Sequence, residues 1–182
     1  MRIFVGIPLT AAVIDELSAI SARLRCDGDG LRWSPPESWH ITLQFLGNAG
    51  QEQLDRAVAR LHHIQLPSLP IWLAGLGFFD RAGIVIARIR PTPELLLLQE
   101  RVTAATKLCG FDSEARPYQP HITLARSKGK GQRKALPKLK TTMRPQPSFI
   151  RFVAEEFLLY ESTLGPAGSH YEIRERFPLD GC

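Results

Sequence analysis

The chain has 182 residues, of which 44% are hydrophobic and 23% charged, and it carries a formal net charge of +5. This length suits one domain or two small packed lobes, and the composition excludes a chain that is disordered throughout. No window approaches eighteen consecutive apolar residues, and the first residues lack the features of a signal peptide, so we expect a cytoplasmic protein without a transmembrane helix.

The first half of the chain predicts two strands and two helices. A stripe of apolar residues from Val13 to Leu24 indicates that the first helix buries one face, and the pair Pro35-Pro36 disfavours a helix before the second strand. In chain order we expect a strand at Arg2–Leu9, a helix from its cap Thr10 to about Arg25, a turn at Cys26–Gly30, an extended loop at Arg32–Trp39, a strand from His40, and a helix from Gln51 to His63.

The second half predicts a hairpin, a helix, a single strand and a closing pair of strands. Its clearest boundary is a helix start, where Thr92 is suited to cap the helix and Pro93 takes the first helical position. In chain order we expect strands at Ile71–Asp80 and Gly83–Arg90, a helix from Thr92 that stops at Gly110, a strand at His121–Arg126, a mobile basic loop at Ser127–Lys140, and strands at Ser148–Ser162 and His170–Leu179 around the turn Thr163–Ser169. This order indicates an α+β fold with mainly antiparallel sheet.

Positive charge is concentrated in one region. Between Ala115 and Ala154 there are ten basic and no acidic residues, whereas the rest of the chain has 13 basic and 18 acidic ones. A segregated basic region is the expected footprint of a phosphate-bearing partner, although a solvated basic loop explains the charge alone equally well.

The tetrapeptide His-Ile-Thr-Leu occurs twice, at His40–Leu43 and at His121–Leu124. Because alternate side chains of a strand face opposite sides, each copy presents its histidine and threonine on one face and buries its two aliphatic residues on the other. One such copy would be an ordinary half-buried strand. Two copies, each downstream of a predicted helix, indicate a pseudo-two-fold duplication.

If both strands line one site, that site contains two histidines and two threonine hydroxyls. One imidazole can act as a general base and the other as a general acid, while the hydroxyls donate hydrogen bonds to a phosphate oxygen. This set suits displacement at phosphorus. A metal site is the competing use of two histidines, but neither copy has a carboxylate beside it. The cysteines Cys26, Cys109 and Cys182 are widely spaced, so we expect free thiols and no zinc site.

The chain resembles the two-histidine (2H) phosphoesterases, and specifically the bacterial and archaeal RNA 2′,3′-cyclic phosphodiesterases, once called 2′-5′ RNA ligases. The segments that carry the resemblance are RIFVGIPL, WHITLQFLG, PHITLAR and LLYES…YEIRERFPL, in the family's order and over nearly the whole chain. The resemblance implies one bilobal domain, residues 1–182, with two pseudo-symmetric lobes of antiparallel sheet, helices outside, and an active-site cleft between the lobes.

The resemblance also implies a reaction, the hydrolysis of RNA 2′,3′-cyclic phosphate ends to 2′-phosphomonoesters without a metal or another cofactor. His40 and His121 then form the catalytic pair, and Thr42 and Thr123 bind the phosphate. It favours His121 as the base and His40 as the acid, an order that the sequence leaves open. The expected partners are RNA ends or nucleotides with a 2′,3′-cyclic phosphate. We expect no membrane, no obligatory protein partner, and a monomer.

Two further positions differ between the copies. Phe45 lies five residues after His40, and Arg126 lies five residues after His121. A ring and a guanidinium can stack on a nucleobase from both sides, which the resemblance favours, whereas Phe45 could also be a core residue. The basic stretch predicts contacts with the RNA backbone through four residues, Lys128, Lys130, Arg133 and Lys134.

The sequence leaves other functions open. The same groups could run the reaction in the direction of 2′-5′ RNA ligation, or act on another small cyclic nucleotide or on a 2′-5′ oligonucleotide. A different class, a non-catalytic RNA-binding module, would use the basic region alone. The intact pair of His-x-Thr segments argues against that class, because binding does not require two titratable groups.

Overall fold

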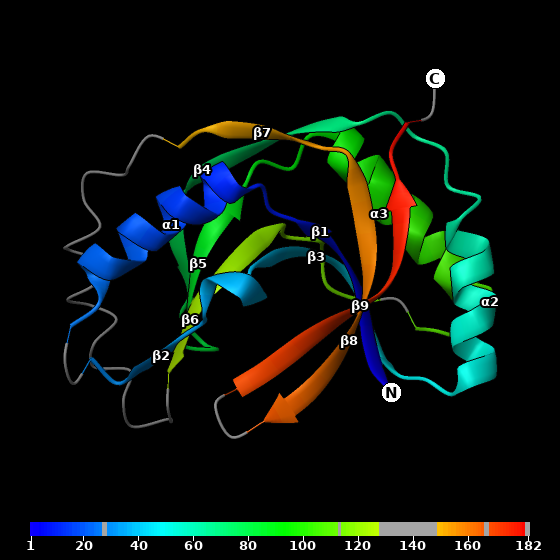
Figure 1. The fold of residues 1–182 in the computed structure, drawn as a ribbon, viewed down its shortest axis with the longest axis horizontal. Coiled ribbons are helices and arrows are strands. Elements are labelled where there is room, and N and C mark those ends of the chain that lie inside the picture. The colour runs from blue at the N-terminus through cyan, green and yellow to red at the C-terminus, as the bar shows by residue number, and fades with distance from the viewer. Residues whose placement is uncertain (27–28, 113, 128–148, 166–167, 181–182) are drawn as a thin grey trace.

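The computed structural model describes residues 1–26, 29–112, 114–127, 149–165 and 168–180 (Figure 1). These residues form an α+β fold, as the sequence predicts. The elements in chain order are β1 (Arg2–Pro8), α1 (Ala11–Leu24), β2 (Leu31–Trp33), the 3₁₀ turn η1 (Pro36–Ser38), β3 (His40–Asn48), α2 (Gln51–Leu61), β4 (Leu69–Phe79), β5 (Ile84–Ile89), α3 (Pro93–Lys107), β6 (His121–Ser127), β7 (Arg151–Ala154), β8 (Glu156–Gly165) and β9 (Gly168–Pro178).

The described strands form two antiparallel sheets. One sheet has the order β3-β1-β8-β9, and the other has the order β2-β6-β5-β4-β7. Each sheet holds one His-Ile-Thr-Leu segment, in β3 and in β6. Apart from β2, the two orders match strand for strand, so the two histidine strands occupy corresponding places in the two sheets.

The pairing registers repeat in the same way. In the first sheet Pro8 of β1 lies opposite His40, and in the second sheet Arg88 of β5 lies opposite His121. The unit β1–α1–β3 therefore corresponds to the unit β5–α3–β6, which agrees with the duplication that the two tetrapeptides indicate.

Contacts cross between the two halves. The side chain of Glu16 in α1 accepts a hydrogen bond of 3.3 Å from the amide of Ile150, just before β7 of the second sheet. Thr106 of α3 donates a hydrogen bond of 2.7 Å to Gln44 of β3, in the first sheet. Figure 1 shows α1 on the side of β4 and β5, and α2 beside α3. Hydrogen bonds from the helices of each half therefore stabilise the position of the other half.

The predicted structure of two regions is wrong. The region Arg32–Trp39 is not one extended loop, because β2 pairs with β6 and Pro36 begins the turn η1, a position where proline's missing N–H is tolerated. The region Ser148–Ser162 is not one strand. It breaks at Glu155, and β7 pairs with β4 while β8 pairs with β1 in the other sheet. All three predicted helix starts are confirmed, and Thr92 accepts a hydrogen bond from the amide of Leu95 at the start of α3.

Candidate active site

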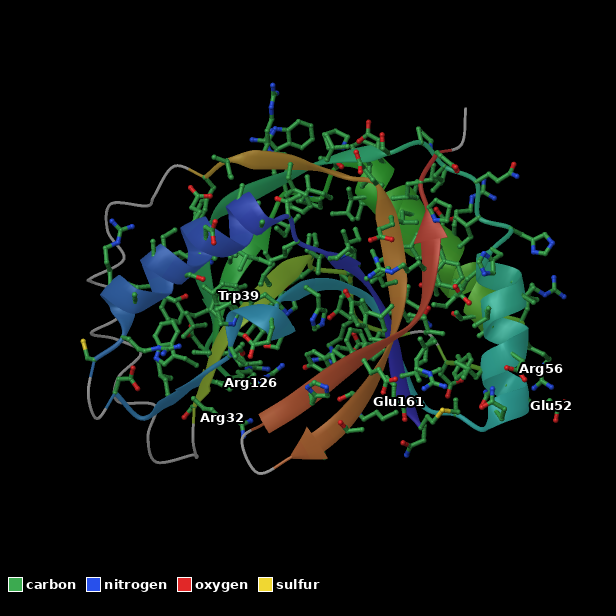
Figure 2. All side chains as sticks on the ribbon, viewed as in Figure 1. Arg32, Trp39, Glu52, Arg56, Arg126 and Glu161 are labelled. Carbon is green, nitrogen blue, oxygen red and sulfur yellow. The ribbon has the colours of Figure 1, made fainter. Side chains whose placement is uncertain are left out.

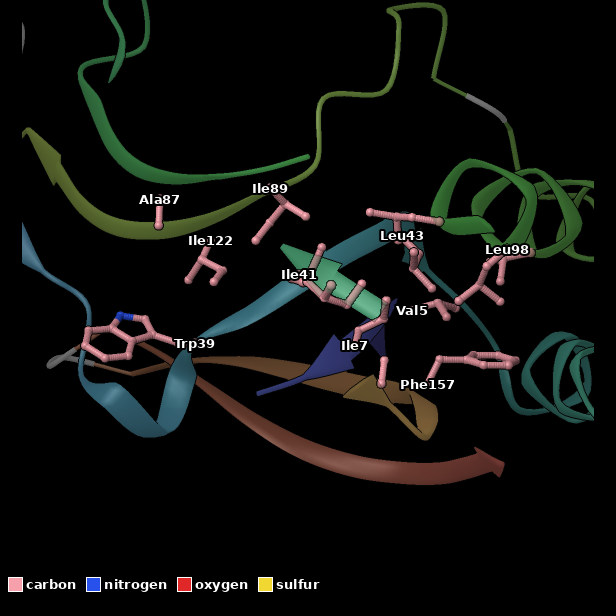
Figure 3. Packing of buried hydrophobic residues seen from close by; sticks show 14 of the residues in the cluster. Val5, Ile7, Trp39, Ile41, Leu43, Ala87, Ile89, Leu98, Ile122 and Phe157 are labelled. Atoms are coloured by element: carbon pink, nitrogen blue, oxygen red, sulfur yellow. The ribbon is translucent and has the colours of Figure 1, made fainter. Parts of the chain in front are cut away.

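The two His-Ile-Thr-Leu segments share one pattern of burial. Ile41, Leu43, Ile122 and Leu124 are all buried, whereas the histidine and threonine of each segment are half-buried. Figure 3 shows Ile41 and Ile122 within one core. The predicted division of each strand into an aliphatic anchor and a polar face is therefore confirmed.

A β-bulge follows the tetrapeptide in β6. One step along β5, from Val85 to Ile86, corresponds to a step from position 125 to position 123 in β6. The extra residue lets Leu124 and Ala125 both point into the core, so that Arg126 is exposed. The bulge thus changes which side chains follow the histidine on its face of the sheet.

The same bulge occurs at the corresponding place in β3. There the step from Val5 to Gly6 in β1 corresponds to a step from position 44 to position 42. Leu43 and Gln44 are consecutive buried residues, and Phe45 is 54% exposed. This exposure rules out the alternative that Phe45 belongs to the core.

The bulges explain how Phe45 and Arg126 reach the polar face. In a regular strand, a residue five positions after a histidine faces the opposite side. The extra residue of the bulge returns this position to the face of the sheet that carries the histidine. Ring contacts agree for Phe45, because the centroid of the Phe4 ring lies 4.6 Å from that of His40 and 5.8 Å from that of Phe45. The structure therefore brings Phe45 together with His40, and places Arg126 correspondingly with His121.

Gln44 holds the first bulge in place. Its side-chain oxygen accepts a 2.7 Å hydrogen bond from the hydroxyl of Thr106 in α3, and its amide nitrogen donates a 3.3 Å bond to the carbonyl of Asp112. The side chains of Gln44 and Thr106 are both buried. The polar residue at this core position is therefore satisfied by contacts from the other half of the chain.

We expect Thr106→Val to destabilise the protein, because it removes the hydroxyl that satisfies the buried oxygen of Gln44. The free energy of unfolding should fall by about 1–3 kcal/mol, measured by urea denaturation. The control is Thr103→Val, at a half-buried position one turn earlier on α3. A Thr106→Val variant as stable as the wild type would show that the bond between Gln44 and Thr106 contributes nothing.

Both histidines are oriented by a backbone carbonyl. The Nδ1 atom of His40 lies 2.9 Å from the carbonyl oxygen of Ser38, and that of His121 lies 2.7 Å from the carbonyl oxygen of Gln119. Because a carbonyl only accepts hydrogen bonds, Nδ1 carries a proton in each ring and Nε2 is the basic nitrogen. In His40 that nitrogen lies 3.0 Å from the hydroxyl oxygen of Thr42.

Aromatic rings surround the catalytic candidates. The ring of His40 lies against Phe4 and meets the edge of Tyr171 at 5.1 Å and the ring of Tyr160 at 5.7 Å. The ring of His121 meets Phe79 edge-on at 4.8 Å. Sequence reasoning did not identify these residues, because they come from β1, β4, β8 and β9, and only the sheet pairing brings them beside the histidines.

The electrostatics link the two histidines with Arg126. Burial lowers the pKa of His40 to about 4, opposed by the hydrogen bond to Ser38 and assisted by the charges of His121 and Arg126. Burial also lowers the pKa of His121, opposed by its bond to Gln119 and assisted by Arg126. The side chains of His40, His121 and Arg126, all predicted site residues, are therefore close enough for their charges to affect the pKa values of the two histidines.

Two other aromatic residues have structural roles. Trp39 is only 6% exposed and belongs to the main core, so it is a packing residue. Tyr118 donates a 3.0 Å hydrogen bond from its hydroxyl to the carbonyl of Thr42, and this bond joins the loop before β6 to β3. Burial raises the pKa of Tyr118, so the hydroxyl keeps its proton for this bond.

Some predicted residues lie outside the part of the chain that the structure describes. They are the four predicted RNA-backbone contacts and one cysteine, namely Lys128, Lys130, Arg133, Lys134 and Cys182. Within the described residues, no helix has the length and hydropathy that a membrane crossing needs, and no three His, Cys, Asp or Glu side chains are grouped so that they could hold a metal ion.

Residues 9–165 match the model of the 2′-5′ RNA ligase superfamily. The chain belongs to this superfamily. It is 29% identical over 177 residues, which are 94% of this chain and 97% of the other, to the RNA 2′,3′-cyclic phosphodiesterase of Archaeoglobus fulgidus. This match confirms the resemblance seen in the sequence.

Solved structures of similar proteins share the superfamily fold. The crystal structure of a protein from Thermus thermophilus matches with a TM-score of 0.80 and 27% identity over 100% of this chain and 99% of the other. E. coli LigT, in its complex with 3′-AMP, matches with a TM-score of 0.83 and 24% identity over 98% and 97% of the two chains. The superfamily fold therefore extends over essentially the whole chain.

Proposed function

We propose that this protein hydrolyses RNA 2′,3′-cyclic phosphate ends to 2′-phosphomonoesters by acid–base catalysis with two histidines and without a metal. The observation that carries the proposal is the matched pair of imidazoles, each oriented through a hydrogen bond at Nδ1 and each with a pKa that burial and, to a smaller extent, the charge of Arg126 lower. The full-length relationship to a protein named as an RNA 2′,3′-cyclic phosphodiesterase supports the same substrate.

The reaction needs one neutral and one protonated imidazole. The neutral histidine takes a proton from water through Nε2 as the water oxygen attacks phosphorus. The bond between phosphorus and the 3′ oxygen breaks, and the protonated histidine gives its proton to that oxygen. The hydroxyls of Thr42 and Thr123 donate hydrogen bonds to the non-bridging oxygens, where negative charge develops. The product has a 2′-phosphate and a free 3′-hydroxyl, and the two histidines then exchange protons with solvent.

Phe45 and Arg126 hold the terminal nucleobase in this proposal. Phe45 offers an exposed ring on the face of His40, and Arg126 offers a planar guanidinium on the face of His121. A ring and a guanidinium stack on any base through its π-face, so this arrangement fixes the nucleotide without selecting one base strongly.

The product distinguishes this function from its alternatives. We expect the protein to convert adenosine 2′,3′-cyclic phosphate to the 2′-phosphate alone, identified by chromatography against both isomers, and to leave 3′,5′-cyclic AMP unchanged. A 3′-phosphate product, or turnover of the 3′,5′-cyclic nucleotide at an equal rate, contradicts the proposal.

Ligation is the second candidate, because the superfamily match includes 2′-5′ RNA ligase in its name and the same two proton transfers can serve another nucleophile. In ligation a ribose 5′-hydroxyl replaces water: it loses its proton to the base as it attacks phosphorus, and the 3′ oxygen leaves with a proton from the acid. Addition of an RNA strand with a 5′-hydroxyl end, followed by gel analysis, measures joining directly against hydrolysis.

The lowered histidine pKa values predict an acidic optimum for kcat/KM. A group whose pKa is lowered loses its proton at a lower pH, so the form with one protonated histidine decreases as pH rises through the higher of the two values. Because the pKa of His40 is about 4 and that of His121 lies below 6.5, we expect the optimum of kcat/KM between these limits.

The optimum of kcat should lie at higher pH than that of kcat/KM, because a bound phosphate anion raises the pKa of both histidines. The order with His40 as the acid depends on a large rise at His40 itself, since its pKa of about 4 leaves this imidazole neutral near pH 7 in the protein without substrate. An optimum of kcat/KM above pH 7 contradicts the electrostatic description of the site. Initial rates over a series of buffers provide both profiles.

A further inference from the structure

Arg32, which is not among the site residues predicted from the sequence, lies next to the predicted nucleobase-binding residue Arg126. In the pairing of β2 with β6, Arg32 lies directly opposite Arg126, and Trp33 lies opposite Ala125. Residues directly opposite each other in an antiparallel pair share one face of the sheet. Arg32 therefore shares the face of Arg126, and Figure 2 shows the two arginines together at this edge.

This pairing of like charges is unfavourable without a ligand. Two like charges directly opposite in a sheet destabilise it, and the charge of Arg32 contributes, after burial, to lowering the pKa of Arg126. Among the described residues, no carboxylate forms an ion pair with either guanidinium. Arg126, whose charge acts on both histidines, and its neighbour Arg32 thus lie opposite each other with no ion-pair partner among the described residues.

The strand that carries Arg32 is fixed from both ends. One carboxylate oxygen of Asp29 accepts a 2.8 Å bond from the amide of Leu31, and the other accepts a 2.8 Å bond from the indole nitrogen of Trp33. The guanidinium of Arg25 lies over the Trp33 ring at 5.6 Å. The carboxylate of Asp29, three residues before Arg32, is therefore used to hold β2 and forms no ion pair with Arg32.

We propose that Arg32, together with the edge of the Arg126 guanidinium, binds a phosphate on the 5′ oxygen of the terminal nucleotide. This inference rests on the proposed function and makes it more specific, because the preferred substrate is then the end of an RNA chain rather than a nucleoside cyclic phosphate. The cyclic phosphate lies at the histidines and the base lies on Arg126, so the next anion along an RNA chain is the phosphate on the 5′ side. Arginine provides the paired N–H donors that a phosphate accepts.

The test compares three substrates that differ only at the 5′ oxygen. These are adenosine 2′,3′-cyclic phosphate, its 5′-phosphorylated form, and the dinucleotide ApA with a 2′,3′-cyclic phosphate end. We expect the wild-type protein to prefer the second and third substrates, and Arg32→Gln to reduce that preference by about 10- to 100-fold through KM, with kcat nearly unchanged. The second and third substrates distinguish a terminal 5′-phosphate from a phosphodiester.

Two controls separate binding from structure. Arg23→Gln changes an exposed arginine of α1 and should leave the preference unchanged. Arg32→Lys should restore part of the preference, because it restores the charge but not the paired donors. Thermal unfolding of Arg32→Gln without ligand should occur at the same or a higher temperature than in the wild type, because the repulsion with Arg126 is removed.

The inference can fail independently of the proposed function. It is overturned if the wild type has no preference, if Arg32→Gln lowers kcat/KM equally for all three substrates, or if that variant unfolds at a lower temperature. If none of the substrates turns over, the proposed function fails. Calorimetric titration with adenosine 2′-phosphate and with adenosine 2′,5′-bisphosphate then still measures whether Arg32 recognises the 5′-phosphate.

Discussion

We expect His40→Ala and His121→Ala each to lower kcat on adenosine 2′,3′-cyclic phosphate by about 100- to 10,000-fold, the usual contribution of a positioned acid or base. The fold should survive in both variants, because both histidines are half-buried on the polar faces of their strands and the buried anchors are the neighbouring aliphatic residues. Circular dichroism and the unfolding temperature check this directly.

The double variant gives a sharper result. Because the acid and the base act in one displacement, His40→Ala with His121→Ala should be only slightly slower than the worse single variant. His63→Ala is the matched control, since this histidine is exposed beyond the end of α2 and its ring bonds only to the carbonyl of Ala59 among the described residues. Near-normal turnover by either single variant removes that histidine from the mechanism.

We expect Gly6→Ala to lower kcat by roughly 100-fold, although residue 6 performs no chemistry. Gly6 lies opposite Thr42, and a Cβ atom there would lie 2.9 Å from the carbonyl oxygen of Ile41, 3.4 Å from Cδ2 of His40 and 3.5 Å from Cε2 of Tyr160. The nearest atom belongs to the backbone, so β3 must move, and a displacement of about 1 Å at a catalytic group can cost this much.

The comparison for Gly6 is Gly50→Ala. A Cβ atom at Gly50 would meet nothing within 4 Å, so this substitution should leave kcat unchanged. Both proteins are assayed well below their unfolding temperatures, so that the rate reports on geometry rather than on the folded fraction. Equal rates for the two variants would show that β1 tolerates a methyl group beside His40 and that the site is not closely packed there.

The burial pattern of the two His-Ile-Thr-Leu segments is predictable from sequence because it depends on the local alternation of side chains along a strand. The tetrapeptide alone predicts which side chains of each copy are buried, and the structure agrees at all four aliphatic positions. The α+β class follows in the same way from apolar periodicity and from helix starts such as Thr92.

The positions of Phe45 and Arg126 are not predictable from alternation. A spacing of five residues places them on the wrong face of a regular strand, and only the bulges at Leu43–Gln44 and Leu124–Ala125 correct this. A signal was present in the sequence, since Gln44 is a polar residue directly after a buried leucine. Its meaning depends on Thr106, 62 residues away, which sequence periodicity does not reveal.

The remaining differences arise from long-range pairing. The break at Glu155, which sends β7 and β8 to different sheets, lies inside a continuous strand-like sequence with no glycine or proline. Arg32 lies in a stretch that its two following prolines mark as a loop, yet β2 pairs with β6 and places it opposite Arg126. Local propensity says nothing about either partner.

In the proposed mechanism two histidines open the cyclic phosphate without a metal. The most direct measurement is the rate of hydrolysis of adenosine 2′,3′-cyclic phosphate by the purified protein after dialysis against EDTA and in its presence. We expect the full rate to remain and the 2′-phosphate to be the product. Loss of the rate in EDTA, with recovery when a divalent metal is added, would contradict this mechanism.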